Sequence, residues 1–309
     1  MGKLTGIISK ISGSAGNVTF KQRGGETIVS EKVTTIRNPR TDAQMQTRTK
    51  WGNIIAMYKG IRPLLNYGFE NKPKNLSDYN MFVKVNMQRT PVYLTKQAIA
   101  GGACVAAPYQ FSQGSLPAIV ISGSGNSAKT DIYLGALTIS ATTTVAQFAA
   151  AVVENNADYK YGDQISFFRI AQKTNAETGI PYCQFSASKV VLDATDTETK
   201  LWDIVNRVGF SVQDSSLAHS ESNFVGAFGW VHTRKADGKT LVSSQSLVSA
   251  NDTLLAEYQG DMAYSLAKSS FGASVEAFLV PDAESTGNTA GAGGGNDNPP
   301  SGGGGNDSL

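Results

Sequence analysis

The sequence predicts an α+β protein, in which a small basic N-terminal part is followed by a longer part rich in strands. Three observations predict this class. Two short runs of alternating apolar and polar residues flank Gly24 and Gly25. An amphipathic segment with helical spacing begins after Thr41. From about residue 92 the chain becomes rich in Ser, Thr and Ala, with short apolar runs separated by turn-forming residues.

The first predicted element is a β-hairpin over residues 18–30. Residues 18–23 alternate apolar and polar side chains, as a half-buried strand does, and residues 26–30 form a second run. Gly24 and Gly25 between them can both adopt the positive φ that a two-residue hairpin turn requires. Lys21 and Arg23 then share one face of the first strand.

A helix is predicted to begin after Thr41. Pro39 disfavours helical backbone angles at the residue before it, so the chain turns there. Thr41 can cap the helix and Gln44, three positions later, can complete a capping box. Apolar residues then recur at helical spacing and define the expected buried face: Trp51, Ile54, Ile55, Tyr58, Ile61 and Leu65. Pro63 is expected to end the helix near Arg62.

A second helix is predicted from Ser77 to a point before Pro91, with three side chains facing inward: Tyr79, Phe82 and Val83. Together with the hairpin, the two helices predict a compact basic module over residues 1–91. The following residues, 92–215, predict a sandwich-like β domain. Its expected strands are 117–122, 131–135, 164–170 and 182–186, with one helix over 144–153.

The remaining chain predicts one more structured segment and a tail. Residues 216–283 form either a separate segment or part of the preceding domain. In this segment, strands over 228–234 and 240–248 flank an Asp237-Gly238 turn. A helix over 252–268 and a strand over 273–280 follow. The tail, residues 284–309, is rich in Gly, Asn, Ser and Asp, a composition that predicts disorder.

The net charge of +2 conceals a strong asymmetry along the chain. Residues 1–90 carry 15 Lys and Arg against 5 Asp and Glu, whereas residues 91–309 carry 12 against 20. Such an asymmetry indicates that the basic part meets an anionic partner or the acidic part of a neighbouring copy. The alternative is a basic face that is simply solvated. Six basic residues are the candidate contacts: Lys21, Arg23, Arg37, Arg40, Arg48 and Lys50.

The N-terminal part also resembles a family known only as a domain of unknown function in gut bacteria and their phages. The resemblance lies in Ser12-Gly13-Ser14-Ala15-Gly16-Asn17-Val18, in Asn38-Pro39-Arg40-Thr41 with Ala43, Gln44 and Arg48, and in Pro63-Leu64-Leu65 with Gly68 and Phe69. It covers residues 1 to about 90 and supplies no catalytic residue. Its phage association implies a role in a virion or a prophage. The longer second part of this chain departs from the family.

No arrangement of residues in the sequence predicts catalysis, a metal or a cofactor. His219 and His232 lack a second His or Cys at metal-ligand spacing, and His232 is expected to be exposed on a strand. Cys104 and Cys183 do not make a disulfide framework, and the sequence leaves open whether they pair. Residues 193–198 form an acidic loop without the glycine and final glutamate of a calcium loop. Gly123 and Gly125 are assigned to a hairpin turn rather than to a dinucleotide site.

These observations favour a non-enzymatic structural or interaction protein, and the resemblance implies that a phage or prophage encodes it. It would associate with a protein partner or with itself through the basic N-terminal module. The alternative is a nucleic-acid-binding protein whose basic module contacts phosphates non-specifically. A surface adhesin is a weaker third hypothesis. No signal peptide or membrane-spanning run is evident, so we expect a soluble protein, cytoplasmic on synthesis, that acts there or within a virion.

Overall fold

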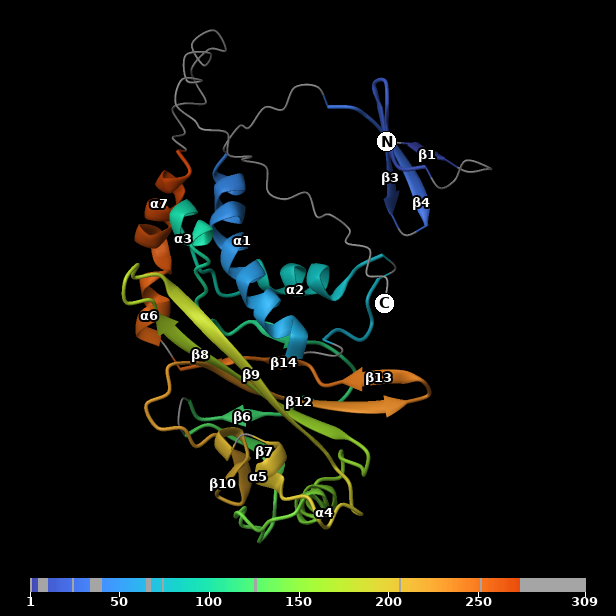
Figure 1. Cartoon of the computed structure of the whole chain (residues 1–309), viewed down its shortest axis with the longest axis vertical. Helices are drawn as coiled ribbons and strands as arrows, with labels where there is room; N and C mark the ends of the chain where they lie inside the picture. The colour runs from blue at the N-terminus through green and yellow to red at the C-terminus, as the bar shows by residue number, and fades with distance from the viewer. Residues whose placement is uncertain are drawn as a thin grey trace.

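A computed structural model describes residues 2–4, 11–23, 25–33, 41–64, 68–73, 75–124, 127–205, 207–250 and 252–272 (Figure 1). It confirms the α+β class. Four strands near the N-terminus form one sheet, and the rest of the described chain surrounds a second, five-stranded sheet. None of the described helices is both long and apolar enough to cross a membrane. The strand expected over 273–280 and the tail lie outside the described residues.

The N-terminal sheet has the order β1-β4-β3-β2 and is antiparallel throughout. It contains the predicted hairpin, because β3 (Val18–Arg23) pairs with β4 (Glu26–Glu31) in the expected register, with Lys21 opposite Ile28. The outer strands are β1 (Gly2–Leu4) and β2 (Gly13–Ala15). Figure 1 shows this sheet apart from the helices and strands of the rest of the molecule.

The second sheet is built on three long strands: β8 (Gln164–Thr174), β9 (Pro181–Val191) and β12 (Gly226–Ala236). Its order is β13-β12-β8-β9, and β15 (Val248–Ser249) also pairs with β12. β13 (Lys239–Val242) completes the predicted hairpin with β12. Asp237 and Gly238 in this turn both have positive φ, as a two-residue hairpin requires.

Helices cover one face of this sheet (Figure 1). Phe168, Ile170 and Val231 point from β8 and β12 into a hydrophobic cluster that also contains Met57 and Phe82. The helices on this side are α1 (Asp42–Ile61), α2 (Asp78–Asn86), α3 (Lys96–Ala100), α6 (Asp252–Glu257) and α7 (Gly260–Ser270). A 3₁₀ turn, η1 (Arg62–Leu64), follows α1 where Pro63 was expected to end the helix.

The opposite face packs on a smaller sheet and on α4 (Val145–Asn155). Phe167 and Trp230, which alternate with the residues of the helix-covered face, join Ile132 and Phe148 in a second cluster. The small sheet has the order β10-β11-β7-β6. Its strands are β6 (Ile121–Ser122), β7 (Lys129–Tyr133), β10 (Ser211–Gln213) and β11 (Ser216–Ala218). Two sheets therefore share this core, which agrees with the expected sandwich-like arrangement.

Short elements connect these layers. β5 (Gln110–Ser112) pairs with β14 (Gln245–Ser246), while α5 (Leu201–Ile204) and η3 (Arg207–Gly209) precede the small sheet's last two strands. Before β5, residues 103–107 are buried and outside any strand. Side-chain amides satisfy this backbone: Asn53 bonds both the N–H and the carbonyl of Val105, at 2.7 and 2.9 Å, and Gln172 accepts from the Ala106 N–H at 2.8 Å.

Several expected details differ from the structure. The buried residues of α1 are Met45, Thr49, Asn53, Ile54, Met57 and Ile61, whereas Trp51, Ile55 and Tyr58 are only half-buried. The buried face of α1 is thus turned towards Asn53, which bonds the backbone of Val105. Within the strand expected over 117–122, only residues 121–122 pair. The helix expected over 252–268 is divided into α6 and α7, and Gly260, with φ of 77°, begins the second piece.

The domain boundaries expected at residues 91, 215 and 283 stay predictions. Across the first of them the packing is continuous, because Ile54 and Phe82 belong to the same hydrophobic cluster as Phe111 and Phe168. The helices of the predicted N-terminal module therefore pack directly on strands of the predicted second domain.

Candidate functional site

Of the six predicted basic residues, the structure describes four and does not bring these four together. Lys21 is exposed on β3, and Arg23 ends the same strand. Arg48 and Lys50 are half-buried on α1, which Figure 1 shows apart from the N-terminal sheet. Arg37 and Arg40 lie outside the described residues. The described members thus divide between two separate elements.

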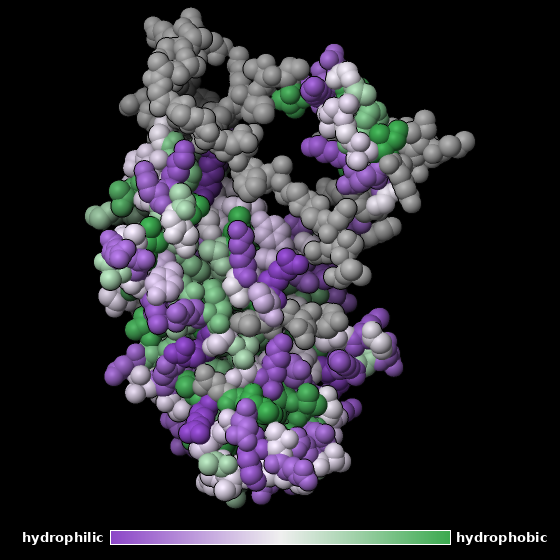
Figure 2. All heavy atoms as spheres, in the orientation of Figure 1, coloured by the Kyte–Doolittle hydropathy of each residue, from purple (hydrophilic) through white to green (hydrophobic). Residues whose placement is uncertain are grey.

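The N-terminal sheet nevertheless presents a mixed surface (Figure 2). Lys21 and Lys32 are exposed beside it, and so are the apolar side chains of Ile11 and Val33, the latter 69% exposed. Ile11 and Val33 are therefore apolar area on this part of the molecule that a partner could cover.

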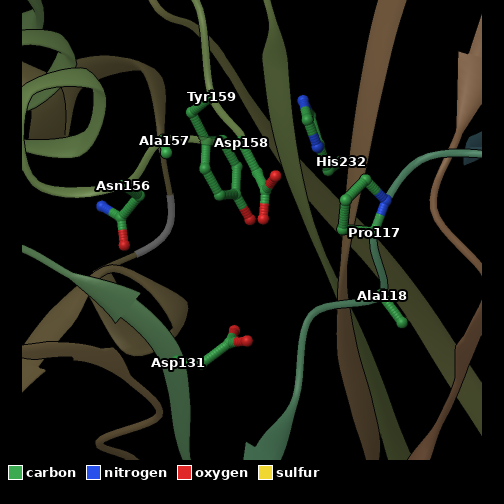
Figure 3. A pocket seen from close by; sticks show the side chains of 8 residues that line it. All are labelled: Pro117, Ala118, Asp131, Asn156, Ala157, Asp158, Tyr159 and His232. Carbon is green, nitrogen blue, oxygen red and sulfur yellow. The ribbon is translucent and has the colours of Figure 1, made fainter.

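A second candidate site, which the sequence did not predict, is a small open pocket of about 150 Å³ (Figure 3). Its lining comes from four places in the chain: the loop before β6, the strand β7, the loop after α4 and the strand β12. The lining residues are Pro117, Ala118, Asp131, Asn156, Ala157, Asp158, Tyr159 and His232. Asp131 and Asp158 are exposed at the rim, whereas Tyr159 and His232 are buried.

Behind the pocket, His232 is held by a buried carboxylate. Its Nε2 lies 2.8 Å from Asp163 Oδ2, and Asp163 also accepts from Nε and Nη2 of Arg234 at 2.7 and 2.6 Å. The ionised carboxylate can only accept, so Nε2 of His232 carries the proton in this contact. Tyr159 stacks on the imidazole at 4.4 Å. The expectation of an exposed His232 is therefore wrong: the side chain is 1% exposed because Asp163 satisfies it.

Asp163 is strongly biased towards its ionised form. Burial opposes ionisation, but the hydrogen bonds from Arg234, His232 and the Lys160 N–H outweigh it and lower the pKa of Asp163 to about 2. At neutral pH this carboxylate is thus a fixed anion. It positions both the imidazole and the guanidinium at the back of the pocket.

The carboxylate of Asp131, at the rim of the pocket, has fewer stabilising hydrogen bonds than that of Asp163. Partial loss of water raises the pKa of Asp131, and the nearby Asp158 raises it further, although Asp131 accepts from the Val120 N–H at 3.1 Å. Burial raises the pKa of the Tyr159 phenol, and the negative charges of Asp131, Asp158 and Asp163 add to this shift. Both shifts reflect the carboxylates that lie around the pocket.

The other chemistry-bearing residues have structural surroundings. His219 is buried and stacks on Phe228 at 4.0 Å, with Nε2 3.9 Å from Glu221. Cys104 and Cys183 are both free thiols, and Cys183 Sγ donates towards the Cys104 carbonyl at 3.4 Å. The two cysteines therefore do not form a disulfide with each other in this structure. The acidic loop over 193–198 forms turns, in which Asp193 accepts from the Thr195 N–H at 2.8 Å.

The pocket is lined mainly by oxygen and nitrogen acceptors from separate parts of the chain. Within the described part of the chain, no group of three or more His, Cys, Asp or Glu residues could hold a metal ion. The lining offers carboxylates, one phenol and one imidazole. These residues are up to about a hundred positions apart in the sequence, so spacing could not reveal them. The available local signal was a polar Asp163 directly before the apolar strand run at 164–170.

The chain was compared with protein-family models, with curated proteins and with solved structures, and nothing in these three comparisons matches it.

Proposed function

We propose that this chain is a non-enzymatic structural or interaction protein that docks on a protein partner or on a neighbouring copy through its N-terminal part. The observation that carries the proposal is the N-terminal sheet, which stands apart from the main body with charged and apolar side chains exposed (Figures 1 and 2). Among the described elements the strands of this sheet contact chiefly one another, so its outer strands are available to pair with a partner.

The charge distribution supports association between copies. The basic excess of residues 1–90 is opposite in sign to the acidic excess of the remaining chain, so contacts between the two parts of neighbouring copies would be electrostatically favourable. The resemblance of residues 1 to about 90 to a phage-associated family supports a virion or an assembling particle as the setting of this role.

Self-association is tested by size-exclusion chromatography with light scattering over a hundredfold range of protein concentration. We expect oligomers that dissociate on dilution and at high salt. The double variant Lys21→Glu/Arg23→Glu reverses two charges on β3 and should shift assembly to higher concentration. Lys173→Glu/Lys235→Glu is the matched control, because it makes the same charge change at exposed positions on β8 and β12. A protein that stays monomeric throughout and binds no virion component would contradict the proposal.

Nucleic-acid binding through the same basic residues is the competing function. Fluorescence anisotropy with labelled DNA and RNA at two salt concentrations separates the two functions. Tight binding that weakens steeply with salt, and that the Lys21→Glu/Arg23→Glu variant loses, would replace the docking proposal. Absence of binding at low salt removes the alternative.

A further inference from the structure

The pocket that Asp131 and Asp158 line is also lined by Tyr159, a largely buried residue whose hydroxyl has no hydrogen-bond partner within the described residues. Tyr159 is 9% exposed, and in Figure 3 its hydroxyl points to the side of the pocket where the carboxylates of Asp131 and Asp158 lie. Within the described part of the chain this hydroxyl makes no hydrogen bond. A hydroxyl that faces the pocket without a protein partner is available as an acceptor for an N–H donor of a bound group.

Within the described residues, the ion pair with Arg234 compensates the carboxylate of Asp163 but not those of Asp131 and Asp158. The Arg234 guanidinium is already engaged, with Asp163 and with the Asp158 carbonyl at 2.7 Å. The nearby Lys129 pairs with Asp214 at 2.8 Å instead. Neither rim carboxylate has a salt-bridge partner within the described residues, and each raises the pKa of Tyr159.

We propose that this pocket binds one organic cation, a guanidinium or primary ammonium group, between the carboxylates of Asp131 and Asp158 and above the hydroxyl of Tyr159. The inference goes beyond the docking function and does not depend on it.

The size and chemistry of the pocket define the ligand. A volume of about 150 Å³ is below the roughly 300 Å³ at which pockets begin to hold drug-sized molecules, and it suits the end of a single side chain or a small amine. Carboxylates and a phenol oxygen are acceptors for N–H donors. One face of the Tyr159 ring is stacked on His232, so the cation meets oxygen atoms at the ring edge. Because a guanidinium presents several N–H groups in a planar fork, it should bind more tightly than an ammonium.

The test is a titration of the full-length protein with methylguanidinium chloride at constant ionic strength, followed by amide chemical shifts in two-dimensional NMR. We expect saturable shifts of the amides of Val120, Asp131 and residues 156–159. Methylammonium should produce the same pattern with weaker affinity. N-methylurea, a neutral analogue of similar shape, should leave these amides unchanged.

Three variants separate the proposed contacts from general electrostatics. Asp131→Asn should weaken methylguanidinium binding about tenfold, because it removes one charge-assisted hydrogen bond. Tyr159→Phe keeps the stack on His232 and should weaken binding by about threefold to fivefold. Glu177→Gln removes an exposed charge in the turn between β8 and β9, at the far end of β8 from the pocket, and should leave the affinity unchanged.

The proposal is overturned if the shifts do not saturate, if they are spread evenly over the surface, or if N-methylurea causes the same changes. It is also overturned if Glu177→Gln weakens binding as much as Asp131→Asn, since the effect would then be general. The dispersion of each variant's spectrum shows whether it has folded.

The same spectra distinguish two sources of the cation. If a basic side chain of a second copy occupies the pocket, the amides of residues 156–159 will shift on dilution of the protein alone, and methylguanidinium will compete with this change. If the ligand is a small free amine, these amides will be independent of protein concentration. Both results support a cation site, and they differ in whether a second copy of the chain or a free amine supplies the cation.

Discussion

Asp163 accepts hydrogen bonds from three directions, and its buried charge is compatible with folding only because of them. Arg234 approaches with two nitrogens, His232 with one, and the Lys160 N–H with another. A buried ion pair is costly to desolvate, so its net contribution is modest, but removing one partner leaves the other charge uncompensated. Asp163 therefore holds the side chains of His232 and Arg234 in position at the back of the pocket.

We expect Asp163→Asn to lower the free energy of unfolding by about 2–3 kcal/mol, because Arg234 and His232 lose their anionic acceptor. Chemical denaturation at pH 7 measures this change. Asp214→Asn is the control, since it removes an exposed aspartate whose surface pair with Lys129 contributes at most about 1 kcal/mol. Equal effects of the two variants would contradict a supporting role for Asp163.

The same carboxylate predicts how stability depends on pH. Its pKa is about 2 in the folded protein and 3.8 without the fold, so the folded state prefers the ionised form. The resulting stabilisation, on the order of 2 kcal/mol, is fully present above about pH 4 and is lost as the pH falls towards 2. Unfolding curves of the native chain and of Asp163→Asn between pH 2 and 7 check this prediction: the difference between them should shrink below pH 4. A constant difference would exclude this source of acid sensitivity.

At the scale of elements, two helices begin with the same pair of residues but are capped differently. Before α1, Thr41 Oγ1 accepts weakly from the Gln44 N–H at 3.4 Å, and Gln44 Oε1 is buried without a hydrogen-bond partner within the described residues. Before α4, both halves of the box are present. Thr144 Oγ1 accepts from the Gln147 N–H at 3.3 Å, and Gln147 Oε1 accepts from the Thr144 N–H at 2.9 Å. A Thr followed three residues later by a Gln predicts a capping box equally before α1 and before α4.

This difference predicts unequal costs for two identical substitutions. Thr144→Ala should lower the free energy of unfolding by about 1–2 kcal/mol, because a complete box is lost. Thr41→Ala should cost only about 0.5 kcal/mol, because its hydrogen bond is long and unreciprocated. Urea denaturation of both variants provides the comparison. A larger cost at Thr41 than at Thr144 would contradict the geometry.

At the scale of the whole molecule, the helix layer lies close to the central sheet at Gly60. A Cβ atom at this position of α1 would lie 2.1 Å from Cε2 of Phe185 on β9. Phe185 belongs to the hydrophobic cluster that joins the helices to the sheet. The absent side chain at Gly60 thus lets the two layers approach each other.

Gly60→Ala should therefore destabilise the protein by about 1–3 kcal/mol, although alanine is normally the better helix former by about 1 kcal/mol. Thermal or chemical denaturation measures the change. The double variant Gly60→Ala/Phe185→Leu should lose less than the sum of the two single variants, since the smaller side chain relieves the overlap. Additive effects would show that the contact does not limit the packing.

Local sequence patterns predicted much of the secondary structure but little of the candidate site. The hairpin at 18–30, the helices after Thr41, Ser77 and Thr144, and the Asp237-Gly238 turn all appear as expected, because turns and caps depend on neighbouring residues. The pocket could not be predicted in this way. Its residues come from segments that meet only when the small sheet and α4 pack on the central sheet.

The sequence by itself determined the α+β class, the positions of most helices and hairpins, and the separation of basic from acidic residues along the chain. Only the tertiary structure decided which polar groups are buried. Asn53 enters the core because Val105 supplies matching backbone groups, and His232 is buried because Asp163 and Tyr159 enclose it. The physical reason is that a polar side chain is buried without a large cost only where hydrogen-bond or stacking partners are available. These partners are about 50 to 75 positions away in the chain.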